Sequence, residues 1–434
     1  MSVDGIRRDT PLPGGPASPE AADHTGAPGA ADDLWAGHAG PLRGVRVIDI
    51  TSMIAGPFAT NLLADFGAEV IKVEQPGGGD ACRGIGPFAR GESLKFPSLN
   101  RNKKAVTLDL GDPRGAALFR RLCAGADLLV ENYRPGVMER WGLGPDDLRR
   151  DNPRLVVVRI SGYGQTGPYR DKAGFGTPAT AFAGLTYLLG YPDRPPLSVP
   201  ISLADLLAGL YGALAALMTL YWRDARGGKG QVADVSLYES VFRLLESLVA
   251  EYGVAGHVRE RRGDLGGGAS PAGTYATGDG RYVVLVCSTD RTFNRLAEAI
   301  GRPDMITDPR YSTNARRVKR REEVDAIVGA WLRQRTLAES QRLLDAVGCP
   351  LSPVNSIADI FADAHYRARE DIVEVDHPRL GRVSMPGLVP RFSETPGRIV
   401  HGGPDPATHN GAVLGGLLGL GAEEIEALRR NGVV

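Results

Sequence analysis

The sequence predicts an α/β fold, in which a mostly parallel sheet carries helices on both of its faces. Short β-branched runs alternate with helical segments from about residue 42 onward. Such alternation implies right-handed crossover connections, which place the helices against the sheet. After about residue 237 the rhythm changes, and this indicates a second, smaller α/β unit.

The first half of the chain contains a repeated strand–helix–strand pattern. A buried strand is expected within 42–50, followed by a helix at 57–66 and a second strand at 69–74. The pattern continues with strands at 105–110, 127–131, 155–161 and 231–236 and helices at 114–123 and 144–150. These strands are short runs rich in valine, isoleucine and leucine, as is typical of strands buried on both faces.

The longest apolar run spans 206–222 and contains no charged side chain. At about 17 residues it lies at the lower limit for crossing a membrane. Asp205 and Arg223 flank the run directly, and no other segment is comparably apolar. We therefore interpret it as a buried helix and expect no membrane insertion.

The other segments complete the expected domain plan. Residues 1–40 are rich in proline, glycine, alanine and aspartate, which is typical of a disordered extension. The smaller unit is expected at 237–360, with a helix at 237–252, a strand at 282–287 and helices at 292–300 and 321–334. The tail is expected to hold short strands near 372–375 and a last helix at 422–431.

Composition excludes several classes of function. The 434 residues carry a formal net charge of zero, and the basic residues are scattered, so nucleic acid is not an expected partner. The four cysteines form no CxxC pair, which argues against a zinc site and a disulfide framework, and no metal is expected. The N-terminus has no apolar signal segment, and a cytoplasmic location is expected.

Three loops at the carboxyl edge of the predicted sheet have the composition of a phosphate site. They span 52–57, 74–80 and 131–137, and they combine glycines, amides and arginines. A basic and amide-rich stretch at 100–104 adds to them. Small residues at a helix start leave free N–H groups for an anion. A phosphorylated cofactor is predicted, whereas a nicotinamide-dependent dehydrogenase is disfavoured because the GxGxxG motif is missing.

Two further features have both a structural and a catalytic interpretation. Asp205 precedes the long apolar helix, so it either caps that helix or acts as a nucleophile that the helix N-terminus keeps ionised. The run Gly266-Gly267-Gly268 is either a linker or a mobile lid whose amides approach a reacting carboxyl group. These residues alone leave both questions open.

Six segments, in the same order along the chain, resemble the family III CoA-transferases, also called the CaiB/BaiF family, which includes formyl-CoA:oxalate and carnitine CoA-transferases. The segments are LRGVRVIDITSMIAGPFATNLLADFGAEVIKVEQPGGGD, NRNKKAVTLDL, ENYRPGVMERWGL, SGYGQTGPY, SLADLLAGLYGALAAL and GGKGQVADVSLYES. The resemblance implies a large Rossmann-like domain formed by 41–236 and 361–434, a small domain at 237–360, and an interlocked, ring-like homodimer. It identifies Asp205 as the nucleophile, and Gly266, Gly267 and Gly268 as the loop over the acyl site.

The resemblance also implies where coenzyme A binds. The implied contacts are Ile54, Ala55, Asn100, Lys103, Asn132, Tyr133, Arg134, Arg140 and Lys172. Gln75 stands where some members carry a basic residue, so no phosphate contact is expected there. Coenzyme A and its acyl thioester are substrates, and the implied reaction passes through an aspartyl anhydride and an aspartyl-CoA thioester on Asp205, with no metal.

Several alternatives stay open within this resemblance. Racemases of the family pair the aspartate with a histidine, but Phe175 stands at that place here, and phenylalanine cannot exchange a proton. An intramolecular CoA-transferring isomerase and a non-catalytic partner subunit both remain alternatives. The expected pocket near Phe175, Tyr187 and the glycine loop is not strongly cationic, which favours a monocarboxylate or partly apolar acceptor acid over oxalate.

Overall fold

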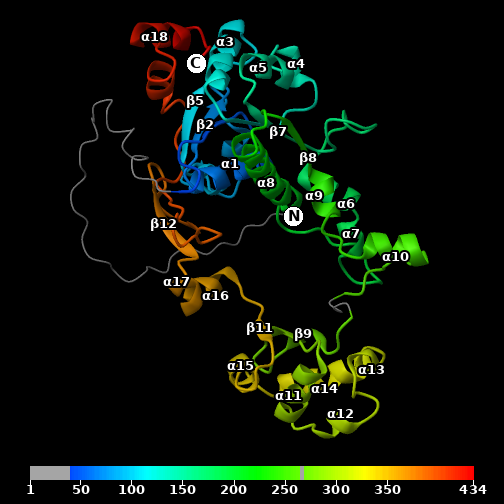
Figure 1. Cartoon of the computed structure of the whole chain (residues 1–434). Helices are drawn as coiled ribbons and strands as arrows, with labels where there is room; N and C mark the ends of the chain where they lie inside the picture. Colours follow the sequence, from blue (N-terminus) through cyan, green and yellow to red (C-terminus); the bar gives the residue numbers. More distant parts are fainter. Residues whose placement is uncertain (1–39, 264–267) are drawn as a thin grey trace, which may run out of the picture. The chain divides into compact units, whose positions relative to one another are not determined.

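The computed structural model describes residues 40–263 and 268–434. A six-stranded parallel sheet organises its larger part (Figure 1). Its strands are β1 (Arg46–Asp49), β2 (Glu69–Glu74), β5 (Lys103–Thr107), β6 (Leu128–Glu131), β7 (Val156–Ser161) and β8 (Val232–Ser236). The order across the sheet is β5-β2-β1-β6-β7-β8, and every pairing is parallel. This order reverses direction between β1 and β6, as in Rossmann-type folds, and the predicted α/β class is confirmed.

Alternate residues of each strand point into two separate cores, one on each face of the sheet. Val47 and Leu128 pack on one face, and their neighbours Ile48 and Leu129 pack on the other. Helices lie on both faces. The helices of this part of the chain are α1 (Ala55–Asp65), α2 (Lys95–Asn100), α3 (Pro113–Ala124), α4 (Val137–Arg140), α5 (Pro145–Asp151), α6 (Gly176–Phe182), α7 (Leu185–Leu188), α8 (Leu203–Ala225), α9 (Leu237–Phe242) and α10 (Leu248–Ala255), of which α7 and α10 have no buried residue. A 3₁₀ turn at Ala81–Gly84 and the hairpin β3 (Phe88–Ala89) and β4 (Glu92–Ser93) lie between β2 and α2.

A third core lies within residues 275–351 and belongs to the smaller unit. Its sheet is antiparallel in the order β11-β10-β9, with helices packed against it. The elements are β9 (Ala272–Ala276), β10 (Tyr282–Val286), β11 (Leu351–Pro353), α11 (Asp290–Ala299), α12 (Asp304–Thr307), α13 (Asn314–Val318), α14 (Arg321–Arg333) and α15 (Leu337–Asp345). Leu237 and Val241 of α9 pack into the core beside α8, and the expected start of the small unit at 237 stays a prediction.

The C-terminal segment returns to the large sheet. Asp109 donates its backbone N–H to the Val433 carbonyl at 2.8 Å, and Thr107 donates to Asn410 Oδ1 at 2.9 Å. Val413 and Val434 are part of the core on that face. The elements of this segment are α16 (Ile357–Ala362), α17 (Ala364–Ala368), β12 (Ile372–His377), β13 (Gly381–Pro386), a π-helical turn at Gly411–Gly415 and α18 (Ala422–Arg430).

The long apolar helix is α8, and it packs against α1 and β7. It is the one described helix that is long and apolar enough to cross a membrane, and 44% of its most apolar window is buried inside the protein. The helix expected at 237–252 is interrupted, because the chain turns between α9 and α10 and Glu246 adopts a left-handed conformation with a φ of 49°. The extension expected at residues 1–40 lies outside the described residues except for Gly40.

Candidate active site

Two loops meet at the carboxyl edge of the sheet, where the strand order reverses. They follow the neighbouring strands β1 and β6, and the Asn132 side chain joins them. Its Oδ1 accepts a hydrogen bond from the Ser52 N–H at 3.0 Å, and its Nδ2 donates to the Ser52 carbonyl at 2.8 Å. Open α/β sheets bind their ligands at this point of the topology. Asn132 thus fixes the loop that leads into α1.

The start of α1 is arranged to receive an anion. Met53 has a left-handed φ of 71°, and its N–H donates to Asp80 Oδ1 at 2.9 Å. Ile54 precedes the helix, and no side chain caps the helix N-terminus that begins at Ala55. The first turn also carries no acidic residue. Uncapped N–H groups at a helix start attract phosphate and carboxylate groups.

A network of buried charges supports this loop from beneath. Lys103 Nζ lies 2.9 Å from Asp49 Oδ2, and Lys72 Nζ lies 2.7 Å from Asp80 Oδ2. Lys72 also donates to the Thr51 carbonyl at 2.8 Å. Burial raises the pKa of Asp49, but the charges of Lys103 and Lys72 outweigh it and lower that pKa below its ordinary value. Burial lowers the pKa of Lys103 to about 8, so this ion pair is charged at neutral pH.

Asn100 and Lys103 were expected to contact coenzyme A, and this stays a prediction. Both residues are completely buried. The ammonium group of Lys103 donates to Asp49 Oδ2, to the Pro57 carbonyl at 2.9 Å and to Asn100 Oδ1 at 2.8 Å. Its three hydrogens are therefore all used inside the protein. These side chains shape the edge of the sheet from within.

The other expected contact residues are Tyr133, Arg134 and Arg140, which follow β6, and Lys172. Tyr133 packs edge-to-face on Trp141, with 5.1 Å between the ring centroids. The side chains of Arg134 and Arg140 are exposed and form no ion pair within the described part of the chain. Lys172 is exposed, with its Nζ 3.4 Å from the centre of the Tyr169 ring.

Asp205 lies in the first turn of α8, and its position differs from the expected one. The helix begins at Leu203 and Ser202 is its N-cap residue, so Asp205 does not cap the helix. Gly209, one turn further, allows close packing, because a Cβ there would lie 2.8 Å from the Ala55 carbonyl oxygen. The packing of α8 on α1 therefore brings Asp205 toward the loop after β1.

The Asp205 carboxylate lies directly against the backbone of α6. A Cβ placed on Gly176 would come within 1.9 Å of Asp205 Oδ2, so only glycine leaves room for the carboxylate there. Burial raises the pKa of Asp205 to about 6, against the smaller opposing effects of its own backbone N–H and of Lys95. The helix N-terminus was expected to have the largest effect on the pKa of Asp205, but burial has a larger one. At pH 7 about nine-tenths of such a group is still ionised.

A cavity of about 530 Å³ is lined by residues that neighbour Asp205 in the sequence, although Asp205 itself is not part of its lining. Ser202 and Leu206, which flank Asp205 in the sequence, are part of its wall, and so is Thr177, which follows Gly176. The remaining wall is mostly apolar, and Lys95 is the one charged residue among the described residues that line it. The full lining is Ile54, Pro87, Leu94, Lys95, Ser98, Leu99, Thr177, Val199, Pro200, Ile201, Ser202 and Leu206.

Sequence reasoning missed Lys95 and Gly176, and it placed the pocket wall elsewhere. Phe175 and Tyr187 do not line this cavity, and the Tyr187 hydroxyl donates to the carboxylate of Glu260 instead. The only signal for Gly176 was its place in the segment AGFG after SGYGQTGPY. Nothing in the segment ESLKFPSLN distinguishes Lys95 from an exposed surface lysine.

Of the expected glycine loop, Gly266 and Gly267 lie outside the described residues. Gly268 is described, and its carbonyl accepts a hydrogen bond from Asn314 Nδ2 at 2.6 Å. A Cβ added to Gly268 would meet no heavy atom within 4 Å. Its expected role over the acyl site stays a prediction.

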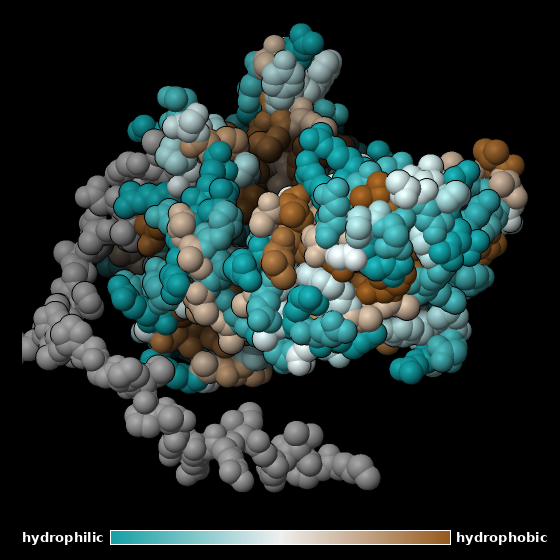
Figure 2. Space-filling model, turned by 90° about the horizontal axis from the view of Figure 1, so that it is seen from below, coloured by the Kyte–Doolittle hydropathy of each residue, from teal (hydrophilic) through white to brown (hydrophobic). Residues whose placement is uncertain are grey.

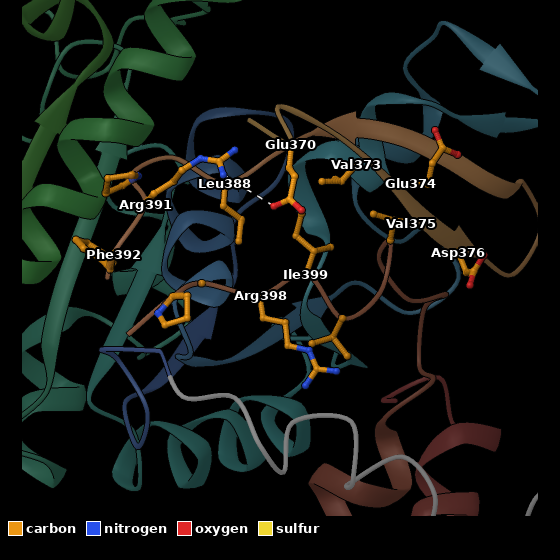
Figure 3. A pocket seen from close by; sticks show the side chains of 14 residues that line it. Glu370, Val373, Glu374, Val375, Asp376, Leu388, Arg391, Phe392, Arg398 and Ile399 are labelled. Carbon is orange, nitrogen blue, oxygen red and sulfur yellow. Dashed lines mark ion pairs between the residues drawn. The ribbon is translucent and has the colours of Figure 1, made fainter. Parts of the chain in front are cut away.

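A second cavity, of about 580 Å³, lies between the β12–β13 hairpin and residues 388–400 (Figure 3). The side chains of Arg391 and Glu370 point toward each other across it, with 3.9 Å between their nearest charged atoms. It contains none of the residues of the edge described above. Within residues 40–263 and 268–434, no group of three or more histidine, cysteine, aspartate or glutamate side chains could hold a metal ion.

Comparison with known proteins gives consistent matches over nearly the whole chain. The model for "CoA-transferase family III" matches residues 42–410. The succinyl-CoA–D-citramalate CoA-transferase of Chloroflexus aurantiacus is 43% identical, and the alignment covers 91% of this chain and 98% of that protein. The β subunit of succinyl-CoA–L-malate CoA-transferase from the same organism is 45% identical, with 91% and 98% covered. A crystal structure of a CaiB/BaiF family protein from Brucella suis superposes with a TM-score of 0.77 at 31% identity, covering 87% of this chain and 99% of that one.

Proposed function

The chain belongs to CoA-transferase family III and is a CoA-transferase, and from this premise we propose that it transfers CoA between dicarboxylic acids through covalent intermediates on Asp205. The observation that carries the proposal is the Asp205 carboxylate itself. It lies against Gly176 in the first turn of α8, and Thr177, Ser202 and Leu206 close by in the sequence line a cavity together with Ile54, the residue before α1. A carboxylate that is partly desolvated but ionised is a competent nucleophile.

The proposed reaction balances without a metal or an external base. Asp205 attacks the thioester carbonyl of the donor, the C–S bond breaks, and a mixed anhydride and the CoA thiolate result. The thiolate attacks the Asp205 carbonyl, which releases the donor acid and leaves an aspartyl-CoA thioester. The acceptor carboxylate attacks this thioester to give a second anhydride. The returning thiolate then attacks the acceptor's carbonyl, forming the new acyl-CoA and restoring Asp205.

Each feature of the site supports one requirement of this reaction. Burial raises the pKa of Asp205 to about 6, which marks a less stabilised and hence more reactive anion. The start of α1 at Ala55 offers N–H groups to an anionic part of CoA. We place the phosphates of CoA near Arg134, Arg140 and Lys172, whose charges are exposed and have no acidic partner among the described residues.

The relatives indicate which acids the chain uses. Both Chloroflexus proteins are named for succinyl-CoA as donor, and their named acceptors, D-citramalate and L-malate, are dicarboxylic acids. This replaces the expectation of a monocarboxylate or partly apolar acceptor. We propose succinyl-CoA as the donor and a four- or five-carbon dicarboxylic acid as the acceptor.

We also propose that the chain works as a homodimer in the cytoplasm. Apolar side chains reach the surface in several patches of the face seen in Figure 2. Along α8 a further stripe of apolar residues is between 41% and 61% exposed: Leu210, Leu214, Leu217, Met218, Tyr221 and Trp222. Exposed apolar surface of this extent marks protein interfaces, and a second copy would cover it. All four cysteines are free and buried, in keeping with a reducing compartment.

The test is mass spectrometry of the protein incubated with succinyl-CoA and then with hydroxylamine, beside the variant Asp205→Ala. Hydroxylamine converts an activated aspartyl group into a stable hydroxamate. We expect this modification on the peptide that contains Asp205, and its loss in the variant. Turnover by Asp205→Ala at the wild-type rate would contradict the mechanism. Light scattering of the pure chain tests the assembly: a monomer that is active alone would contradict the homodimer, and one active only with a related chain would indicate a heteromer.

A further inference from the structure

Lys95 is an isolated cation in the wall of the cavity beside Asp205. It opens α2, and the next residues of that helix, Phe96 and Leu99, are buried in a small core with Cys82. The Lys95 N–H is held by Ser93 Oγ at 3.2 Å. The backbone of Lys95 is therefore anchored, and the residue is part of the cavity wall.

The lysines near Lys95 in the sequence all have acidic partners. Lys72 pairs with Asp80 at 2.7 Å, Lys103 with Asp49 at 2.9 Å, and Lys104 with Glu69 at 3.0 Å. Lys95 forms no ion pair and no side-chain hydrogen bond with any described residue, although it is half-buried. A partly desolvated ammonium group without a partner is costly. An anionic ligand in the cavity would supply the missing partner.

Asp205 is near Lys95 but is not that partner. The positive charge of Lys95 acts on the Asp205 carboxylate and favours its ionised form, yet the two groups are not within ion-pair distance. Lys95 lines a cavity of about 530 Å³ with mostly apolar walls, and Ser202 and Leu206, which flank Asp205 in the sequence, line it as well. A short carbon chain with a carboxylate at each end fits this arrangement, since one end reaches the nucleophile while the other reaches the cation.

We propose that Lys95 is a specificity-determining residue that binds the remote carboxylate of the acyl group, the one not joined to CoA. The inference rests on the proposed function, because it assigns a role within the same cavity. A charge-assisted hydrogen bond from Lys95 holds the remote carboxylate, and the apolar wall around Ile54 and Leu206 contacts the methylene chain. The reacting carboxyl group then lies at Asp205.

The variant Lys95→Gln tests this role through the choice of substrate. We expect kcat/KM for succinyl-CoA relative to butyryl-CoA, which has the same chain length without the remote carboxylate, to fall about 10- to 100-fold. The fall should appear as a rise in KM for succinyl-CoA, with kcat/KM for butyryl-CoA changed less than about twofold. Lys95→Arg, which keeps the charge, should retain most of the preference. Lys319→Gln, an exposed lysine of the smaller unit, is the matched control.

Other outcomes separate the possible failures. Equal losses for succinyl-CoA and butyryl-CoA would overturn the inference, because Lys95 would then act on CoA or on the reacting carbonyl. An unchanged succinyl preference in Lys95→Gln would overturn it as well. Absence of any Asp205 adduct in the wild-type protein would instead reject the proposed mechanism. Calorimetric binding of succinate against butyrate to the wild type and to Lys95→Gln then tests Lys95 without turnover, and equal affinities in the wild type would reject the role.

Discussion

Two regions of the molecule each contain an aspartate and a lysine, but they differ in burial and in pairing. One region is the edge of the sheet beneath the loop after β1, and the other is the surroundings of Asp205 and Lys95. Beneath the loop, Asp49 and Lys103 are fully buried and 2.9 Å apart, and each satisfies the other. In the second region, Lys95 in the cavity wall and Asp205 near it are only partly buried and do not pair with each other. Buried pairs that are complete maintain a structure. Unpaired charges at a cavity wall remain available to a ligand, and this difference separates scaffold from site.

The largest expected effect is at the cavity. Asp205→Asn removes the nucleophile but keeps the shape of the side chain, so we expect the rate of CoA transfer to fall at least about a thousandfold. The stability of this variant to urea should not fall, because a neutral amide replaces a partly desolvated carboxylate. A variant that lost stability and activity together would show that Asp205 belongs to the scaffold.

A change at the buried ion pair of Asp49 and Lys103 should affect stability more than activity. Lys103→Met leaves Asp49 buried without its partner, which should lower the free energy of unfolding by about 3–5 kcal/mol. Urea denaturation measures this, and the double variant Asp49→Asn with Lys103→Met should recover part of the loss. Among molecules that stay folded, KM for the acyl-CoA should change little. A large rise in KM with unchanged stability would instead show that Lys103 contacts CoA directly.

A smaller effect on the rate is expected at Gly176, where the backbone of α6 contacts the Asp205 carboxylate. In Gly176→Ala the added Cβ would lie 1.9 Å from Asp205 Oδ2, so the carboxylate must move. Misplacement by about 1 Å costs up to about a hundredfold in rate, and we expect a fall of about 10- to 100-fold in kcat. Gly253→Ala, where the added Cβ meets no atom within 4 Å, is the control. Equal rates for the two variants would contradict the role given to Gly176.

The smallest effect is the response to pH. Since the pKa of Asp205 is raised to about 6, kcat/KM should fall about tenfold per pH unit below 6 as the nucleophile is protonated. Lowering the pH should also change the stability of the folded state in opposite directions through Asp205 and through Asp49. Protonation of Asp205 stabilises the folded state as pH falls from about 6 to 4. The pKa of Asp49 lies below its ordinary value, so its ion pair contributes stability that is lost at lower pH. A rate profile that is flat down to pH 5 would contradict this assignment.

The sequence predicted the elements better than the site. The strand expected at 69–74 is β2, and the helix expected at 114–123 is α3 with one added residue at each end, because local periodicity marks such elements. The resemblance implied that Asn100 and Lys103 contact coenzyme A, but it did not indicate that tertiary packing buries both side chains. Lys95 was missed for the opposite reason. Its importance comes from its approach to Asp205, which is distant in the sequence, and no local pattern encodes that approach.

The position of the cavity wall in the chain bears on how related chains could differ in the acid that they use. It is built largely from Pro87–Leu99 and Val199–Leu206, and neither segment contributes a strand to the six-stranded sheet. On the proposed role of this cavity, substitutions in these two segments would change the size and charge of the acid that fits, while the strands and the buried charges under β1 stay the same. A new acid specificity would then need changes in two short segments only.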